Sequence, residues 1–241
     1  MCRISVVIPT RNREDLLRQA IASVQRQTAA DWELLVCDDG STDGTEAMVR
    51  EQSRDDPRIR WLGGESEAAE GVSRGAPYQR NRGLAAAAGG VVLFLDSDDL
   101  LAPHALEQRS AALENDASLD FVAAQGMAFT HRPGDRRELF NVMDRGEPLE
   151  RFVSGDMIWG TPSVLWRKTS VERIGGWDAS LRRLQDVELH TRALARGLRF
   201  ATLENVDWYV RLVEGERVSK VKPDDGVIAS DLHFFTRLRD E

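Results

Sequence analysis

The fold is decided by the stretch Val91-Val92-Leu93-Phe94-Leu95-Asp96-Ser97-Asp98-Asp99. Five apolar residues end abruptly at three carboxylates within four positions. A short, continuous apolar run is typical of a strand that is buried on both faces. Carboxylates this close together repel one another unless a cation or several hydrogen-bond donors compensate. The alternative is that Ser97, Asp98 and Asp99 only cap the next helix.

The same order of strand, loop and helix recurs through the first hundred residues. Apolar, mostly β-branched runs predict buried strands, and helical spacing of apolar residues predicts the helices between them. The expected strands span residues 4–8, 32–37, 58–62 and 91–95, and the expected helices span 16–24, 45–52 and 79–88. This alternation predicts an α/β fold with a mostly parallel central sheet and helices on both faces.

The second half of the chain has fewer such units. Strands are expected over 119–124, 163–166, 199–203 and 207–213, and helices over 103–114, 169–174 and 185–196. We therefore expect a single domain over residues 1–221, of which 101–221 is irregular and shapes a substrate site. Residues 222–241 form a polar tail with one amphipathic patch near 232–238.

Composition narrows the class of protein. The 241 residues carry a net charge of -8, which argues against a general nucleic-acid binder because such proteins need clustered cations. Two cysteines are too few for a disulfide framework and favour a reducing compartment. Neither a signal peptide nor a run of about 20 apolar residues is visible. We expect a cytoplasmic protein, either free or bound peripherally at the inner face of the membrane.

Three polar clusters are expected to line one crevice. In open α/β sheets, ligands bind outside the carboxyl ends of the strands, and Thr10–Arg13, Asp38–Ser41 and Asp96–Asp99 each follow a predicted strand. Asp96 and Asp98 offer the hard oxygen ligands that suit Mg²⁺ or Mn²⁺. The glycine-rich dinucleotide turn and the phosphate-binding loop ending in Gly-Lys-Ser/Thr are both missing.

Four motifs, taken in order, resemble the family 2 glycosyltransferases of the GT-A fold. They are Ser5-Val6-Val7-Ile8-Pro9-Thr10-Arg11-Asn12-Arg13, Asp38-Asp39-Gly40-Ser41-Thr42-Asp43-Gly44-Thr45, Arg80-Asn81-Arg82-Gly83-Leu84 and Leu95-Asp96-Ser97-Asp98-Asp99. Beyond Leu100 the likeness rests on Gly175-Gly176-Trp177-Asp178 and Asp186-Val187-Glu188-Leu189.

The resemblance implies a nucleotide-diphospho-sugar donor, with a UDP-sugar favoured, and a divalent Mn²⁺ or Mg²⁺. The sugar would pass with inversion to a hydroxyl of a glycan, a lipid-linked or another acceptor. Residues 1–100 would bind the donor and 101–221 the acceptor. By the same likeness Asp98 binds the metal, and the donor nucleotide contacts Pro9, Thr10, Arg11, Arg13, Asp39, Ser41, Arg80, Asp96 and Ser97. Three alternatives are open: a structural role in the turn for Asp38, a surface position for Arg80, and a helix-start role for Asn12 and Arg13.

Inversion requires a base that deprotonates the acceptor hydroxyl. By the resemblance Asp186 is that base, at the start of a helix, where the helix dipole alone is the alternative reason for an aspartate. The usual acidic pair is here Gln185-Asp186, so we expect a lone carboxylate that escapes like-charge coupling and stays ionised. Glu188 is the reserve candidate. Trp159 and Glu188 are the expected acceptor contacts, whereas Trp166 is assigned to the core.

A second departure from the family concerns histidine. Relatives carry one shortly after a Tyr-x-Arg-like segment, but 208–214 has none, and His233 in the tail is a doubtful ligand. Asp98 would then hold the metal almost alone until a diphosphate arrives. Two other functions remain open: a nucleotidyltransferase that makes an activated sugar, and a nucleotide-sugar-binding module without catalysis.

Overall fold

The computed structural model describes residues 3–63, 73–140, 142–212 and 233–236. Within them an eight-stranded sheet has the order β3-β2-β1-β4-β7-β6-β8-β5. The strands of the first half are β1 (Ile4–Thr10), β2 (Trp32–Asp38), β3 (Ile59–Leu62) and β4 (Val91–Phe94), and their helices are α1 (Glu14–Gln25), α2 (Thr45–Asp55) and α3 (Ala76–Ala86). Neighbouring strands here are all parallel, which confirms the predicted α/β fold.

Antiparallel strands enter in the second half. β7 (Val164–Arg167) runs antiparallel to both β4 and β6 (Phe121–Phe129), and β5 (Leu100–Leu101) runs antiparallel to β8 (Phe200–Arg211). The remaining elements are α4 (Ala105–Asn115), α5 (Pro148–Val153), the short 3₁₀ helix η2 (Thr161–Ser163), α6 (Lys168–Arg173) and α7 (Gln185–Ala195). This mixed half agrees with the irregular architecture that was expected.

One strand stands where the sequence predicted two. β8 is continuous from Phe200 to Arg211, and its pairing with β6 shifts register on either side of Gln125. Glu204, Asn205 and Asp207 interrupt the apolar pattern without ending the strand, because β8 bulges there and these residues have no partner in the β6 register. The predicted domain end at 221 and most of the tail lie outside the described residues.

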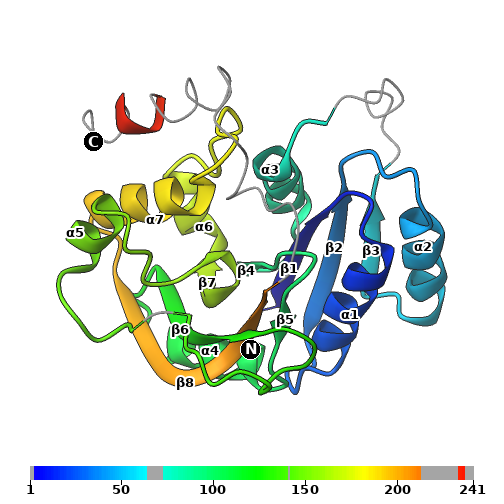
Figure 1. The fold of residues 1–241 in the computed structure, drawn as a ribbon, viewed down its shortest axis with the longest axis horizontal. Helices are drawn as coiled ribbons and strands as arrows, with labels where there is room; N and C mark the ends of the chain where they lie inside the picture. The colour runs from blue at the N-terminus through cyan, green and yellow to red at the C-terminus, as the bar shows by residue number, and fades with distance from the viewer. Residues whose placement is uncertain (1–2, 64–72, 141, 213–232, 237–241) are drawn as a thin grey trace.

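Alternation along the strands builds a core on each face of the sheet. Val6 and Ile8 pack among residues from α1, α2 and α4, whereas Val7 packs among residues from α3, α6 and α7. Figure 1 shows α1 and α2 on the right of the sheet, α3 above β1, and α6 and α7 at the upper left. The two layers leave the carboxyl ends of β1, β2 and β4 at one edge, where loops and helix starts meet.

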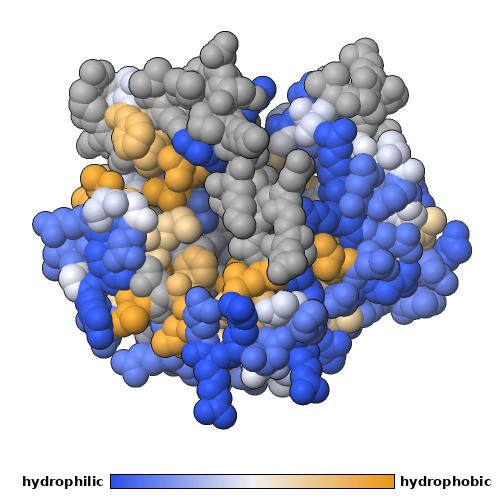
Figure 2. Space-filling model, in the orientation of Figure 1, coloured by the Kyte–Doolittle hydropathy of each residue, from blue (hydrophilic) through white to orange (hydrophobic). Residues whose placement is uncertain are grey.

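The surface differs between the two halves. Figure 2 shows hydrophilic side chains over α1 and α2 on the right, and apolar side chains in patches among polar ones on the left and across the centre. The large apolar residues exposed within the described ranges are Leu139, Leu149, Val153 and Phe235. None of the helices in the described ranges combines the length and apolar character needed to cross a bilayer.

A buried ion pair fastens β8 to α4. Arg109 Nε–H donates to Asp207 Oδ2 at 2.8 Å, and both side chains are fully buried. The Asp207→Ala variant leaves the guanidinium without its counter-ion, so we expect the free energy of unfolding to fall by about 3–5 kcal/mol. Urea titration followed by circular dichroism measures it. The exposed pair Arg50–Glu46 provides the control, because Glu46→Ala should change it by less than about 1 kcal/mol. An equal loss of unfolding free energy in Asp207→Ala and Glu46→Ala would contradict the prediction.

Candidate functional site

The loop after β1 is joined to the loop after β2. Pro9 and Thr10 are the buried last residues of β1, and Arg11 is exposed. The backbone N–H of Asn12 donates to Ser41 Oγ at 2.9 Å, and Asn12 Oδ1 accepts the N–H of Thr42 at 2.7 Å. Asn12 directly precedes the N-cap Arg13 of α1 and links two of the three predicted clusters. Thr10 Oγ1 is buried and has no hydrogen-bond partner among the described residues.

Asp38 and Asp39 have separate roles at the end of β2. Asp38 is buried and accepts the backbone N–H groups of Gly40 and Ser41, so it holds the turn, as its structural alternative proposed. Gly40 has a φ of 83°, which favours glycine. Asp39 is only partly buried and faces the segment that begins α3.

Asp39 fixes the entry into α3. Its carboxylate accepts the N–H groups of Arg74 and Gly75 at 2.9 and 3.1 Å and the Gln79 amide at 2.8 Å, together with the Ser73 hydroxyl. Burial acts to raise the pKa of Asp39, but these hydrogen bonds outweigh it and lower the pKa. Asp39 is therefore an ionised acceptor. No motif in the sequence pointed to its partners.

Two arginines neutralise the acids that follow β4. Arg80 Nη2–H donates to Asp96 Oδ1 at 2.6 Å, and Arg13 Nη1–H donates to Asp98 Oδ2 at 3.0 Å. Both carboxylates are partly exposed, and Ser97 between them is buried. The hydrogen-bond donors that the clustered acids require are thus present in the protein itself.

Asp99 does not cap a helix. The next helix, α4, begins at Ala105, whereas Asp99 Oδ1 accepts the backbone N–H of Arg211 at 3.0 Å. Arg211 Nε–H donates to the carbonyl oxygen of Asp98 at 3.0 Å. The end of β8 therefore holds the acidic turn in place, a role that the sequence did not reveal.

Arg80 joins the two halves of the site. Besides Asp96, its guanidinium donates to Gln185 Oε1 at 3.1 Å and lies over the ring of Trp177 at 4.3 Å. The side chain is buried, so the surface alternative for Arg80 is wrong. Asn81 beside it accepts the N–H of Trp177 and donates to its carbonyl oxygen. Consecutive residues of α3 therefore position the segment that leads into α7.

Asp186 stands in the first turn of α7, next to Gln185. Burial raises its pKa, the negative charge of Asp96 raises it further, and the Arg80 guanidinium opposes both with a smaller effect. The expectation that Asp186 escapes like-charge coupling is therefore wrong, because Asp96 supplies the charge that Gln185 lacks. A carboxylate with a raised pKa is a stronger base than an ordinary aspartate.

The two predicted acceptor contacts are wrong. Trp159 is 1% exposed and packs in the core against Phe121 and Phe152. Glu188 is 3% exposed, and its carboxylate is paired through both oxygens with Arg192. Arg192 in turn donates to the carbonyl oxygen of Gly176. Glu188 thus supports the turn before α7 and is not a reserve base.

The acidic turn fits a metal that takes most of its ligands from a substrate. Within the described residues no three His, Cys, Asp or Glu side chains gather into a cation cage. His233 pairs with Asp178 at 3.1 Å. Magnesium and manganese sites commonly combine one or two protein carboxylates with phosphate oxygens and water, and the partly exposed Asp98 can provide such a ligand.

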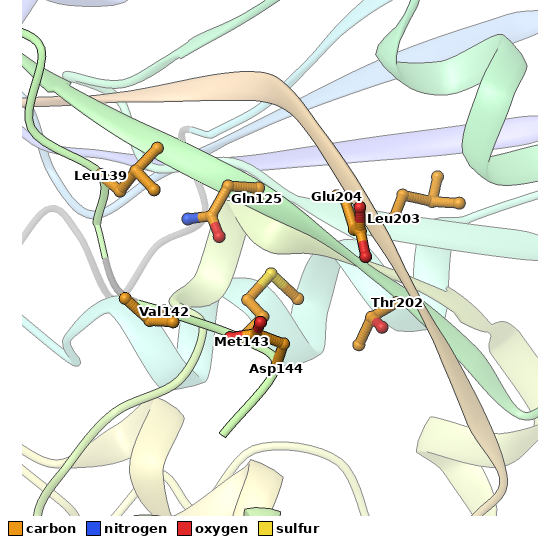
Figure 3. A pocket seen from close by; sticks show the side chains of 8 residues that line it. All are labelled: Gln125, Leu139, Val142, Met143, Asp144, Thr202, Leu203 and Glu204. Carbon is orange, nitrogen blue, oxygen red and sulfur yellow. The ribbon is translucent and has the colours of Figure 1, made fainter.

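A separate cavity of about 270 Å³ lies beside the bulge of β6 and β8. Figure 3 shows side chains around it from both strands and from the segment between β6 and α5: Gln125, Leu139, Val142, Met143, Asp144, Thr202, Leu203 and Glu204. None of them is a predicted site residue, and the volume is below the ~300–1,000 Å³ of typical ligand pockets. The cavity is not where the acids and arginines converge.

Known proteins share both the sequence pattern and the fold. The family model described as "Glycosyl transferase family 2" matches residues 5–171. A β-1,3-glucosyltransferase of Escherichia coli, named WfgD and described as acting on α-D-GlcNAc-diphosphoundecaprenol with UDP-Glc, is 42% identical over 116 residues, which are 48% of this chain and 43% of that protein. A GalNAc(5)-diNAcBac-PP-undecaprenol β-1,3-glucosyltransferase of Campylobacter jejuni is 40% identical over 151 residues, 63% of this chain and 45% of that protein.

Solved structures agree on the fold. Staphylococcus aureus TarS 1–349 in complex with UDP-GlcNAc superposes with a TM-score of 0.77 at 21% identity, over 97% of this chain and 66% of that one. The mannosyltransferase PcManGT from Pyrobaculum calidifontis, in complex with GDP-Man and Mn²⁺, has a TM-score of 0.67 at 18% identity, over 100% of this chain and 65% of that one. The fold is that of the GT-A glycosyltransferases. The matched regions span less than half the length of the two curated relatives.

Proposed function

Because the chain belongs to glycosyl transferase family 2, we propose that it transfers a sugar from a UDP-sugar to an acceptor hydroxyl, with inversion and with the help of Mn²⁺ or Mg²⁺. Residues 1–100 bind the donor and residues 101–221 the acceptor. One observation carries the proposal: Arg80 contacts both Asp96 of the donor half and Gln185, which precedes Asp186 in the acceptor half.

The donor half offers several polar groups that a nucleotide can contact. Asp39 is an ionised acceptor at the end of β2, and Thr10 Oγ1 at the end of β1 is a buried hydroxyl that has no hydrogen-bond partner within the described part of the chain. In this proposal they bind the base and ribose together with Pro9, and Asp96 contacts the ribose. Asp98 holds the metal, which when bound neutralises the charge of the diphosphate leaving group. Arg11, Ser41 and Ser97 line the same edge.

Asp186 acts as the base. It removes the proton of the acceptor hydroxyl while that oxygen forms a bond to the anomeric carbon of the donor sugar. The bond between that carbon and the diphosphate oxygen breaks on the opposite side, so the configuration inverts and UDP leaves. The raised pKa of Asp186 supports this role.

The pH dependence follows from the direction of that shift. A base must be deprotonated, so kcat/KM should fall as the pH drops through the raised pKa of Asp186. We expect the acid limb at a higher pH than an ordinary aspartate, near 3.9, would give. Initial rates at saturating Mn²⁺ across the acid range measure it. The residual rate of Asp186→Asn should lack this limb, and a limb at the same pH in that variant would contradict the assignment.

The acceptor is inferred from relatives. The names of both curated glucosyltransferases specify undecaprenol-linked diphosphate saccharides. We propose a lipid-linked saccharide for this chain too, which places the reaction at a membrane surface. The apolar patches exposed among polar side chains in Figure 2 are compatible with such an acceptor.

Nucleotide binding tests the proposal without knowledge of the acceptor. Thermal unfolding is followed with UDP, GDP, CDP and ADP, each with and without Mn²⁺. We expect UDP to raise Tm most and to require Mn²⁺ for its full effect, because a ligand that binds only the folded state stabilises it. A preference for GDP would change the donor class. If none of the four nucleotides raised Tm, the proposed function would be wrong.

A further inference from the structure

Asp98 already has a cation beside it. The Arg13 guanidinium lies 3.0 Å from Asp98 Oδ2, and the two side chains are 36% and 25% exposed. The Arg13 backbone is fixed immediately before α1, where its N–H donates to Thr45 Oγ1 at 3.3 Å. Only the long side chain is therefore free to move.

Asp98 does not need Arg13 to keep its position. Its carbonyl oxygen accepts Arg211 Nε–H, and the neighbouring Asp99 accepts the N–H of Arg211. Leu95 before the turn is held by a backbone hydrogen bond to Val7 at 2.9 Å. These contacts fix the turn through its backbone, so the contribution of Arg13 is the direct ion pair with the Asp98 carboxylate, which also interacts with the charge of Arg211.

The two arginines at the acidic turn differ in how firmly they are held. Arg80 is 6% exposed in its side chain, stacks on Trp177 and donates to two different residues. Arg13 makes one side-chain contact among the described residues and is six times more exposed. A partly exposed ion pair with a single side-chain hydrogen bond is weak, whereas the buried Arg80 cannot leave without breaking several contacts.

We propose that Arg13 is an exchangeable cation: it neutralises Asp98 in the ligand-free protein and moves to the donor diphosphate when a divalent metal takes its place. The inference rests on the proposed function, because it needs a diphosphate donor and a metal. It makes Arg13 a competitor of the metal before the donor binds and a diphosphate ligand afterwards. The metal should therefore bind poorly until the nucleotide offers Arg13 a second anion.

The test measures Mn²⁺ binding rather than turnover. Free Mn²⁺ is followed by electron paramagnetic resonance in titrations of the wild type, Arg13→Ala and Arg13→Lys without nucleotide. Because an ion pair near the surface contributes a factor of about two to five, Arg13→Ala should bind Mn²⁺ about two- to fivefold more tightly than the wild type. Arg13→Lys keeps the charge and should stay within about twofold of the wild type. UDP binding without metal, measured by calorimetry, should weaken in Arg13→Ala.

Arg18→Ala is the matched control. Arg18 lies on α1, pairs with Glu14 and carries the same charge without contacting Asp98. Arg18→Ala should leave the Mn²⁺ affinity unchanged. An equal gain of affinity in Arg13→Ala and Arg18→Ala would show that any lost positive charge favours the metal, and it would overturn the inference. Unchanged or weaker Mn²⁺ binding by Arg13→Ala would also overturn the inference. The proposed function would still stand in that case if the wild type binds UDP and Mn²⁺. A wild type that binds neither would contradict both.

Discussion

The Asp186→Asn variant is expected to bind the donor as tightly as the wild type and to lose turnover by about 10²–10⁴-fold, the usual contribution of a general base. The substitution removes the basic oxygen but preserves the shape of the side chain. Asp186 Oδ1 accepts the N–H of Val187 at 3.0 Å, and an asparagine oxygen can accept the same hydrogen bond. The start of α7 should therefore be retained.

The result is measured as kcat for sugar transfer beside the dissociation constant for UDP. Asp55→Asn provides a control, because this exposed carboxylate at the end of α2 lies outside the site. Asp55→Asn should keep the wild-type kcat and the wild-type dissociation constant for UDP. Full turnover by Asp186→Asn would show that another group takes the proton. A parallel loss of UDP binding would instead assign Asp186 to the donor.

The Asp98→Ala variant should lose transfer altogether, together with the part of UDP binding that depends on Mn²⁺. The two carboxylates beside it already have partners, Asp96 with Arg80 and Asp99 with the Arg211 N–H, so we expect neither to replace the lost ligand. The turn itself should persist, because Arg211 holds it through the Asp98 carbonyl oxygen and through Asp99.

Calorimetry with UDP, with and without Mn²⁺, separates the two effects. Metal-free binding should be retained or improve in Asp98→Ala, since Arg13 is released from its carboxylate. Asp15→Ala removes an equal charge from the exposed surface of α1 and should bind UDP and Mn²⁺ like the wild type. Metal-dependent UDP binding by Asp98→Ala at wild-type affinity would contradict the metal assignment.

The first half of the fold and the place of the site could be predicted because both depend on local patterns. The segments that became β1, β2 and β4 are short and mostly apolar, and each is followed directly by its polar loop. Since carboxyl ends of parallel strands share one edge, their convergence followed from the topology.

The partners of the acids could not be predicted. Arg13 is 85 residues from Asp98 along the chain, and Arg211 is 112 residues from Asp99. Such pairs depend on how distant elements pack, which local spacing does not encode. The same reason explains Trp159, whose aromatic character suits a sugar platform as well as a core and whose burial is decided by Phe121 and Phe152.

The most direct test of the central claim is the release of UDP from UDP-sugars in the absence of any acceptor. Transferases commonly pass the sugar slowly to water, so UDP should appear with Mn²⁺, and its release should stop in Asp98→Ala and fall sharply in Asp186→Asn. A protein that binds UDP-sugars tightly with Mn²⁺ but releases no UDP from them, even with lipid-linked saccharides added, would contradict the account.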